Sequence, residues 1–313
     1  MPYPYSIEQI NRRAISDPLS FAQECEAIFN RKVDEVAAGI AERSALSRVV
    51  FLSGPSGSGK TTTAKKICDA LKGIGIHAHP VAMDKYYTSY DPETSPRTSD
   101  GEIDLESPYC LDLELLVDHF NKLERGEEVF IPHFDFKTQK RNPSRAVPIR
   151  LKEGEIVIFE GIHALNDLLV NRHPNAFKLY ISARSDITSN SVVCFKRTWT
   201  RLMRRVVRDS FFRGTGALET LKMWANVRRG EKEYISPFKY KADILFDSSM
   251  QYEVAVMKPY ALEALSRIPE ETERIEELQG MLPELMNFEQ IDSAYVPQDS
   301  ILREFIGGGT YEY

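Results

Sequence analysis

One short pattern constrains the fold of this chain more than any other, a glycine-rich turn between two regular segments. The turn reads GPSGSGKT at residues 54–61, follows the β-branched run RVVFLS at 48–53, and precedes a segment with helical patterning from Lys60 to Leu71. Its glycines let the backbone curl so that several N–H groups point at one phosphate, beside the positive end of the helix. The pattern therefore predicts a strand, a phosphate-binding loop and a helix.

The residues of this loop define a candidate nucleotide site. In such a loop the lysine, Lys60, reaches the β- and γ-phosphates, and the hydroxyl of Thr61 ligates Mg²⁺. A glycine turn that precedes a helix by chance is the alternative, but this match lies between a predicted strand and a predicted helix, as the loop requires. We therefore predict ATP and Mg²⁺ as cofactors, with nucleotide-binding residues Gly54, Pro55, Ser56, Gly57, Ser58, Gly59, Lys60, Thr61 and Thr62.

Other short apolar runs predict the rest of a sheet. Helical or loop segments separate these runs, which is typical of an α/β fold with a parallel sheet covered by helices. The predicted strands cover residues 79–83, 155–159, 178–181 and 242–246. Between the second and third strands lies a long insertion of the kind that usually handles a substrate. We expect it to contain a polar loop at 86–101, a helix near 111–123 and a β-hairpin around 129–147.

The two ends of the chain differ from this alternating region. Apolar residues recur at helical spacing between residues 6 and 47, which predicts a helical N-terminal extension over 1–47. After Pro269 the stretch PEETERIEELQGMLPELM is strongly charged and is predicted to be helical. The predicted organisation is this extension, a phosphate-loop domain over 48–262 with its insertion at about 86–150, and a C-terminal helical tail over 263–313.

Two carboxylates follow predicted strands. Glu160 comes directly after the run EIVIF, and Asp84 ends the run PVAMD. Because the carboxyl ends of parallel strands meet at one edge of a sheet, both side chains are expected beside the phosphate loop. Glu160 can then reach Mg²⁺ or its water, and Asp84 can deprotonate an attacking hydroxyl. A solvated carboxylate at a strand end is the alternative for either residue, and the loop on the same edge favours function.

Arginines are concentrated on one helical stretch, at about 200–216. Arg201, Arg204, Arg205 and Arg208 have the spacing i, i+3, i+4 and i+7, so they share one helical face, and Arg213 follows one turn later. Like charges on one stripe repel each other, which suggests an anionic ligand such as a transferring phosphate. A solvated basic face and an RNA-binding stripe are the alternatives. The second conflicts with the acidity of the chain.

Composition limits the other partners. A net charge of −6 and a pI near 5.7 argue against a nucleic-acid partner. The four cysteines are far apart, without a C-x-x-C pair, which is typical of buried thiols in a reducing cytosol. The N-terminus lacks the apolar core of a signal peptide, and the apolar runs are too short to span a bilayer. We predict a cytoplasmic protein without a membrane partner, and a homo-oligomer is compatible with the sequence.

Several motifs together resemble the uridine kinase and phosphoribulokinase family. They are GPSGSGKTT (54–62), MDKYY (83–87), IPHFDF (131–136), IFEGIHAL (158–165) and RLMRRVVRDSFFRG (201–214). RRGEKEYISPF (228–238) and SILREFIGG (300–308) are similar to the bacterial uridine kinase-like branch that often carries an N-terminal TGS-type domain, which this chain does not include. The resemblance implies a fold like that of nucleoside monophosphate kinases. It also implies Asp84 as base, Thr61 and Glu160 at Mg²⁺, and Arg205, Arg208 and Arg213 as lid residues.

The chain departs from the family pattern where the acceptor is bound. Phe134 and Gln139 stand where pyrimidine-selective members carry a tyrosine and a histidine that read the base. The ribose-binding aspartate of the family corresponds to Glu106, with Asp104 as a nearby substitute. These four residues and Tyr87 are the candidate substrate-binding residues. In the lid, Thr215 replaces a second arginine after glycine, and the segment 185–200 has no assigned role.

Three functions are compatible with these patterns. The leading hypothesis is a kinase that transfers the γ-phosphoryl group of ATP to the 5′-hydroxyl of a nucleoside. A kinase of a sugar, sugar phosphate or polyol is the alternative, and Arg97, Arg141 and Arg145 in the insertion could bind the phosphate of such a substrate. A sensor that binds ATP without turnover is more remote, because a sensor needs neither the base Asp84 nor a set of arginines at the transferring phosphate.

Overall fold

The computed structural model describes residues 4–136, 138–268 and 275–312. Within them, the central sheet has five parallel strands in the order β12-β9-β2-β8-β3. The parallel α/β sheet expected from the sequence is therefore present, and each strand lies within two residues of its predicted start. The strands are β2 (Val49–Ser53), β3 (Ala78–Ala82), β8 (Ile156–Glu160), β9 (Phe177–Ser182) and β12 (Ile244–Asp247).

The register of the sheet brings the predicted site residues to one edge. Glu160, the last residue of β8, pairs with Leu52 of β2 on one side and with Ala82 of β3 on the other. The phosphate loop leaves the end of β2, and Asp84 follows the end of β3. Asp84 lies in a short 3-10 turn, η1 (Met83–Tyr86), because β3 ends at Ala82 and not at Met83 as predicted.

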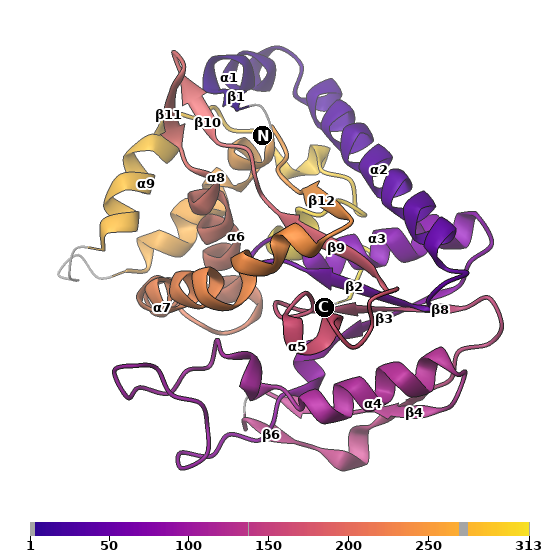
Figure 1. The fold of residues 1–313 in the computed structure, drawn as a ribbon. Coiled ribbons are helices and arrows are strands. Elements are labelled where there is room, and N and C mark those ends of the chain that lie inside the picture. Colours follow the sequence, from indigo (N-terminus) through magenta and orange to yellow (C-terminus); the bar gives the residue numbers. More distant parts are fainter. Residues whose placement is uncertain (1–3, 137, 269–274, 313) are drawn as a thin grey trace.

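Helices cover both faces of the sheet, because strands buried on both faces need an apolar layer on each side. On one face the odd residues of β2, Val49 and Phe51, pack with α4 (Leu113–Glu124) and α5 (Asp167–Val170). On the other face Val50 and Leu52 pack with the larger group of helices. Figure 1 shows these helices on the side of the sheet away from α4. That group contains α2 (Pro18–Arg43), α3 (Lys60–Gly73), α6 (Arg197–Phe212), α7 (Ala217–Gly230) and α8 (Glu253–Ser266).

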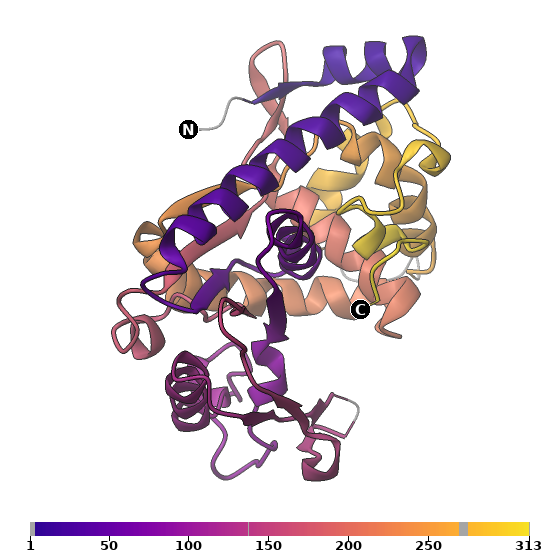
Figure 2. The ribbon, with the colours of Figure 1, turned by 90° about the vertical axis from the view of Figure 1, so that its right-hand side faces the viewer.

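The N-terminal residues form two helices, α1 (Ile7–Ser16) and α2, after the short strand β1 (Tyr5–Ser6). Asp17 separates the helices and accepts a hydrogen bond from the Ser20 N–H at the start of α2. In Figure 2, α2 runs diagonally across α3. Phe29 of α2 packs edge-on against Phe246 of β12, with ring centroids 5.2 Å apart. These helices therefore share the core of the phosphate-loop domain.

The segment 185–200, which had no assigned role, forms a hairpin. Its strands β10 (Ile187–Ser189) and β11 (Val192–Phe195) pair antiparallel, and β10 also pairs parallel with β1. Asn190 and Ser191 make the turn with φ angles of 49° and 67°, a conformation that asparagine tolerates better than most residues. The hairpin joins the N-terminal strand to the region that leads into α6.

The insertion contains the expected helix and hairpin. Helix α4 follows a short turn, η2 (Pro108–Cys110), and strand β4 (Val129–Ile131) pairs antiparallel with β7 (Val147–Ile149). Inside this pair, β5 (Phe134–Asp135) pairs with β6 (Lys140–Arg141), and η3 (Pro143–Arg145) leads to β7. Figure 1 shows the insertion gathered on the α4 side of the sheet.

The C-terminal region packs onto the same core. After α7 the chain forms a π-helical turn, η4 (Glu231–Ile235), a 3-10 turn, η5 (Ser236–Lys241), and then β12 and α8. Of the predicted charged helix, residues 269–274 lie outside the described part, and α9 (Glu276–Met286) confirms the rest. The chain ends with η6 (Ser293–Tyr295) and α10 (Arg303–Ile306). None of the described helices has the length and apolar character needed to cross a membrane.

The packing of α2 predicts that Phe29→Ala destabilises the whole protein. Removing a ring that is 2% exposed should lower the free energy of unfolding by about 3–5 kcal/mol. Ile28→Ala on the same helix is the control, because Ile28 is 44% exposed and should cost far less. Urea denaturation measures both. We expect a single transition whose midpoint moves to a much lower urea concentration in Phe29→Ala. A separate transition of α2 at lower urea would show that the N-terminal helices unfold independently.

Candidate active site

The phosphate loop is built as its glycines require. Gly57 and Gly59 have φ angles of 73° and 81°, in the left-handed region that favours glycine. Gly54 lies so close to β9 that a Cβ atom would be 2.0 Å from the carbonyl oxygen of Ile181. Gly59 is followed at once by Lys60, the first residue of α3. The loop therefore aims the first N–H groups of α3 at the edge where the strands end.

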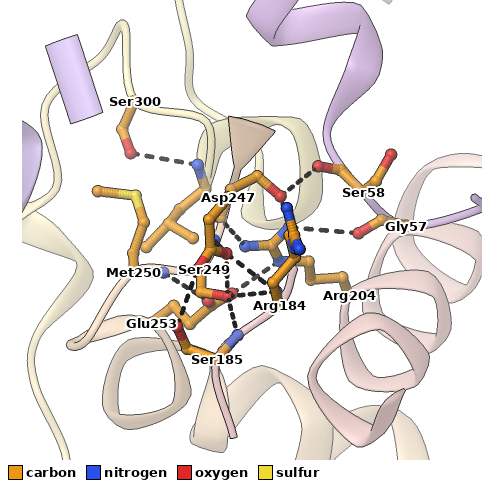
Figure 3. A network of polar contacts seen from close by, with 12 residues as sticks. Gly57, Ser58, Arg184, Ser185, Arg204, Asp247, Ser249, Met250, Glu253 and Ser300 are labelled. Atoms are coloured by element: carbon orange, nitrogen blue, oxygen red, sulfur yellow. Dashed lines mark hydrogen bonds and ion pairs between the residues drawn. The ribbon is translucent and has the colours of Figure 1, made fainter. Parts of the chain in front are cut away.

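Two of the predicted arginines hold this loop from behind. Arg204 donates to the Gly57 carbonyl at 3.3 Å, to the Ser248 carbonyl at 2.8 Å and to Glu253 at 2.7 Å (Figure 3). Arg201 donates to the Ser56 carbonyl at 3.2 Å and forms an ion pair with Glu231. Both arginines are at most 2% exposed.

The prediction that all four arginines of the stripe face an anionic ligand is therefore wrong for Arg201 and Arg204. They lie between α6 and the elements packed over it, and a buried guanidinium needs a carboxylate partner. Sequence reasoning missed those partners, Glu231 and Glu253. Each lies in a helical segment far along the chain, and no local pattern marks it as buried.

The other three arginines converge on one carboxylate, that of Asp209. Arg208 lies 2.8 Å from Asp209, Arg205 3.3 Å and Arg213 4.0 Å. Arg205 also donates to the Ser56 hydroxyl at 2.8 Å, so this cluster borders the phosphate loop. Three cations share one anion, which leaves positive charge for an incoming phosphate.

Thr61 and Glu160 meet at the sheet edge. The Thr61 hydroxyl donates to Oε1 of Glu160 at 3.1 Å. Burial raises the pKa of Glu160 to about 7, because desolvation outweighs the opposing charge of Lys60. Oxygen ligands bound side by side at about 2.1 Å in an octahedral shell are about 3 Å apart. The two oxygens therefore fit adjacent positions of a magnesium shell, which usually keeps water and phosphate oxygens as its other ligands.

Asp84 and Lys60 lie beside this pair. Burial lowers the pKa of the Lys60 ammonium, and Glu160 and Asp84 oppose this shift. Lys60 donates to the Pro55 carbonyl at 3.3 Å. Asp84 is exposed to solvent at the wall of a cavity, and the protein atoms around it partly desolvate the carboxyl and raise its pKa, against the charges of Lys60, Arg213 and Arg208. A carboxylate in this position can accept a proton from a hydroxyl that approaches the phosphate loop.

A cavity of about 190 Å³ opens next to Asp84 in the insertion. Its apolar wall contains Tyr87, Phe134 and Phe136, whose ring centroids are 5.1–6.0 Å apart. The structure therefore brings the predicted residues Asp84, Tyr87, Phe134 and Gln139 together. Sequence reasoning missed several other lining residues, among them Tyr90, Leu105 and Phe136.

Asp104 and Glu106 have different surroundings. Asp104 is 1% exposed, accepts from Arg229 at 2.7 Å and from the Tyr234 hydroxyl at 2.9 Å, and so ties the insertion to α7 and η4. Burial raises the pKa of Glu106 to about 7, and Arg205 is the main opposing charge. Glu106 also packs tightly on Gly230: a Cβ atom added to Gly230 would lie 2.3 Å from the Cβ atom of Glu106. Of the two candidate ribose ligands, only Glu106 has a carboxylate that forms no ion pair with any of the described residues.

Two of the three arginines proposed for a sugar phosphate bind other groups of the insertion. Arg141 donates to the carbonyls of Tyr86 and Tyr87 and to Asp112. Arg97 donates to the carbonyls of Pro92 and Gly101 within its own loop. Arg145 is exposed. These contacts weaken the case for a phosphorylated acceptor.

Known proteins resemble the part of the chain that carries this site. The family model described as the phosphoribulokinase / uridine kinase family matches residues 49–255. A uridine kinase of Staphylococcus aureus is 27% identical over 209 residues, which cover 66% of this chain and 91% of that protein. A putative fructose transport system kinase from Silicibacter sp. TM1040 is similar in fold, with a TM-score of 0.50, 19% identity, and coverage of 68% of this chain and 98% of that one.

The family model spans both the phosphate loop and the arginine cluster, so it covers every site residue described above. The family description names two kinases with different acceptors, so family membership leaves the acceptor open. This chain belongs to the phosphoribulokinase and uridine kinase family and is an ATP-dependent phosphotransferase that acts on a hydroxyl group.

Proposed function

We propose that this enzyme is a nucleoside kinase that transfers the γ-phosphoryl group of ATP to the 5′-hydroxyl. The observation that carries the proposal is the aromatic cavity that opens beside Asp84. Flat aromatic walls stack well on a planar base, and stacking is tolerant of which base is bound. A sugar or polyol would instead require many hydrogen-bond partners, because its hydroxyl groups are costly to bury unpaired. The uridine kinase relative supports the same acceptor.

In the proposed mechanism, each group of side chains in the site has a separate role. Lys60 and the loop N–H groups hold the phosphates, and Arg205, Arg208 and Arg213 stabilise the charge of the transferring group. Asp84 accepts the proton of the attacking hydroxyl. Glu106 accepts hydrogen bonds from the ribose hydroxyls. When bound by Thr61 and Glu160, Mg²⁺ would neutralise charge on the terminal phosphates.

Base recognition should be permissive in this pocket. A site that reads a base with polar groups rejects the wrong base by leaving those groups unpaired, at about 1–3 kcal/mol per group. Phe134 offers no such group. Gln139 offers both a donor and an acceptor on a flexible stem, so it can adapt to more than one base edge.

The acceptor proposal predicts that several nucleosides are phosphorylated at similar efficiency. At saturating ATP, kcat/KM for uridine, cytidine, adenosine, guanosine and inosine should agree within about a hundredfold. Phe134→Ala should raise KM for the nucleoside roughly tenfold or more, because a stacking ring is lost. Phe130→Ala is the matched control, since Phe130 is 57% exposed on β4.

Two outcomes of that comparison would contradict the proposal in different ways. A preference above about a hundredfold for uridine and cytidine over purine nucleosides would reject the permissive pocket. Turnover of a sugar or polyol but of no nucleoside would reject the nucleoside assignment and leave the kinase assignment intact.

The role of Asp84 predicts a catalytic defect with little loss of nucleotide binding. Asp84→Asn should lower kcat by roughly 10²–10⁴ and change KM for ATP much less, because the base acts on the acceptor. Steady-state kinetics measures both constants, and Asp118→Asn on the half-exposed face of α4 is the control. A loss confined to ATP affinity would reassign Asp84 as a nucleotide or metal ligand.

The raised pKa of Glu160 predicts a pH-dependent requirement for Mg²⁺. Below about pH 7 the carboxyl is mostly protonated and neutral, so it binds the metal poorly, and above pH 7 it is ionised. Titration of a fluorescent ATP analogue should therefore need more Mg²⁺ at pH 6 than at pH 8. Glu160→Gln should need more Mg²⁺ at both values and show a smaller pH difference, which comes from protonation of the nucleotide phosphate, whereas the exposed Glu153→Gln should behave as wild type. An unchanged pH difference in Glu160→Gln would place the titrating group elsewhere.

A further inference from the structure

The C-terminal segment lies against the phosphate loop. Ile301, Leu302 and Phe305 are fully buried in the main core. The side chain of Ile301 touches Gly59 so closely that a Cβ atom on Gly59 would be 2.2 Å from it. The ring of Phe305 lies 5.2 Å from the guanidinium of Arg204, the residue that supports the loop from behind. This segment is therefore part of the wall around the loop.

One side chain of the segment occupies donors of the loop itself. Oε2 of Glu304 accepts a hydrogen bond from the Thr62 N–H at 3.2 Å and another from the Thr62 hydroxyl at 2.6 Å. The carboxylate is well enclosed, since Glu304 is 8% exposed. Thr62 is the third residue of α3, so its N–H belongs to the first turn of the helix. These N–H groups are the ones that a phosphate loop turns toward its ligand.

The position of Thr62 indicates which phosphate it faces. Lys60 and Thr61 serve the β- and γ-phosphates and the metal between them. Thr62 lies one residue further into the helix, away from the γ-phosphate. Backbone N–H groups of such loops hold the α- and β-phosphates, so the donor at Thr62 faces the phosphate next to the nucleoside.

The negative charge of Glu304 is unfavourable beside a bound nucleotide. Its carboxylate is close enough to interact with the charges of Lys60 and Arg213, and it adds negative charge to a site that already contains Glu160 and Asp84. Mg²⁺ or the attacking hydroxyl can make use of Glu160 and Asp84, but Glu304 has no such role. A phosphate group brought to Thr62 would meet a carboxylate of the same sign.

Resting on the proposed use of ATP at this site, we propose that the Glu304 carboxylate occupies the α-phosphate position on Thr62. Glu304 is thus a residue that sets nucleotide affinity, because ATP must displace it. Only the side chain has to turn. The segment itself is held by the buried residues named above, by Lys66, which donates to Asp299, and by Arg303, which donates to the carbonyls of Ser293 and Val296.

The test measures nucleotide binding without turnover. A fluorescent ATP analogue is titrated into wild type, Glu304→Gln and the control Glu289→Gln, which makes the same change of charge at an exposed position of the C-terminal region. Glu304→Gln should bind the analogue about tenfold more tightly than wild type, since a competing charged hydrogen bond is lost, and Glu289→Gln should match wild type.

A structure of the wild-type protein crystallised with Mg²⁺ and ADP is the second measurement, and it does not require the variant to fold. The α-phosphate should accept the Thr62 N–H hydrogen bond, with the Glu304 carboxylate turned away. Equal or weaker binding of the analogue by a folded Glu304→Gln, or Glu304 still bonded to Thr62 beside ADP, would overturn the competition. Failure of every protein, wild type included, to bind any nucleotide would instead overturn the proposed use of the site, and the competition with it.

Discussion

The shape of the phosphate loop depends on hydrogen-bond donors behind it. A loop that turns its N–H groups toward a ligand turns carbonyl groups the other way, and buried carbonyls need donors. Arg201 and Arg204 supply these donors to Ser56 and Gly57. Because both guanidinium groups are buried, each in turn needs a carboxylate, which η4 and α8 provide. The loop therefore requires α6, α8 and the turn after α7, and its motif alone is insufficient.

The same helix serves the site in two ways. The arginines of α6 share one face, and this face contacts the phosphate loop at Ser56 and Gly57. The first two residues of the stripe support the backbone of the loop. Arg205 and Arg208, with Arg213 just after the helix, gather around Asp209 at the open end of the site. The arginines differ in their own burial: Arg201 and Arg204 are at most 2% exposed, whereas the side chains of the three arginines around Asp209 are 11–61% exposed and can meet a ligand.

The acceptor cavity and the arginine cluster are mechanically connected. Asp104, in the insertion, binds Arg229 of α7 and Tyr234 of η4, and α7 packs on α6. On the other side of the cavity, Arg141 joins the inner hairpin to the carbonyls that follow Asp84. These contacts hold the aromatic wall, Asp84 and the arginine cluster in fixed positions relative to one another. Ordered polar contacts of this kind position reacting groups more accurately than flexible loops do.

The sequence by itself determined the local parts of this protein. The glycine pattern, the apolar strands and the strand-end carboxylates predicted the phosphate loop, the parallel sheet and the edge where Asp84 and Glu160 meet, because each depends on short-range geometry and on one rule of parallel sheets. Only the tertiary structure decided which arginines support the loop and which can meet a ligand. It also decided the pairing of the 185–200 hairpin with β1 and the position of Glu304 on Thr62. These features are contacts between distant segments, and burial, which no local pattern encodes, determines them.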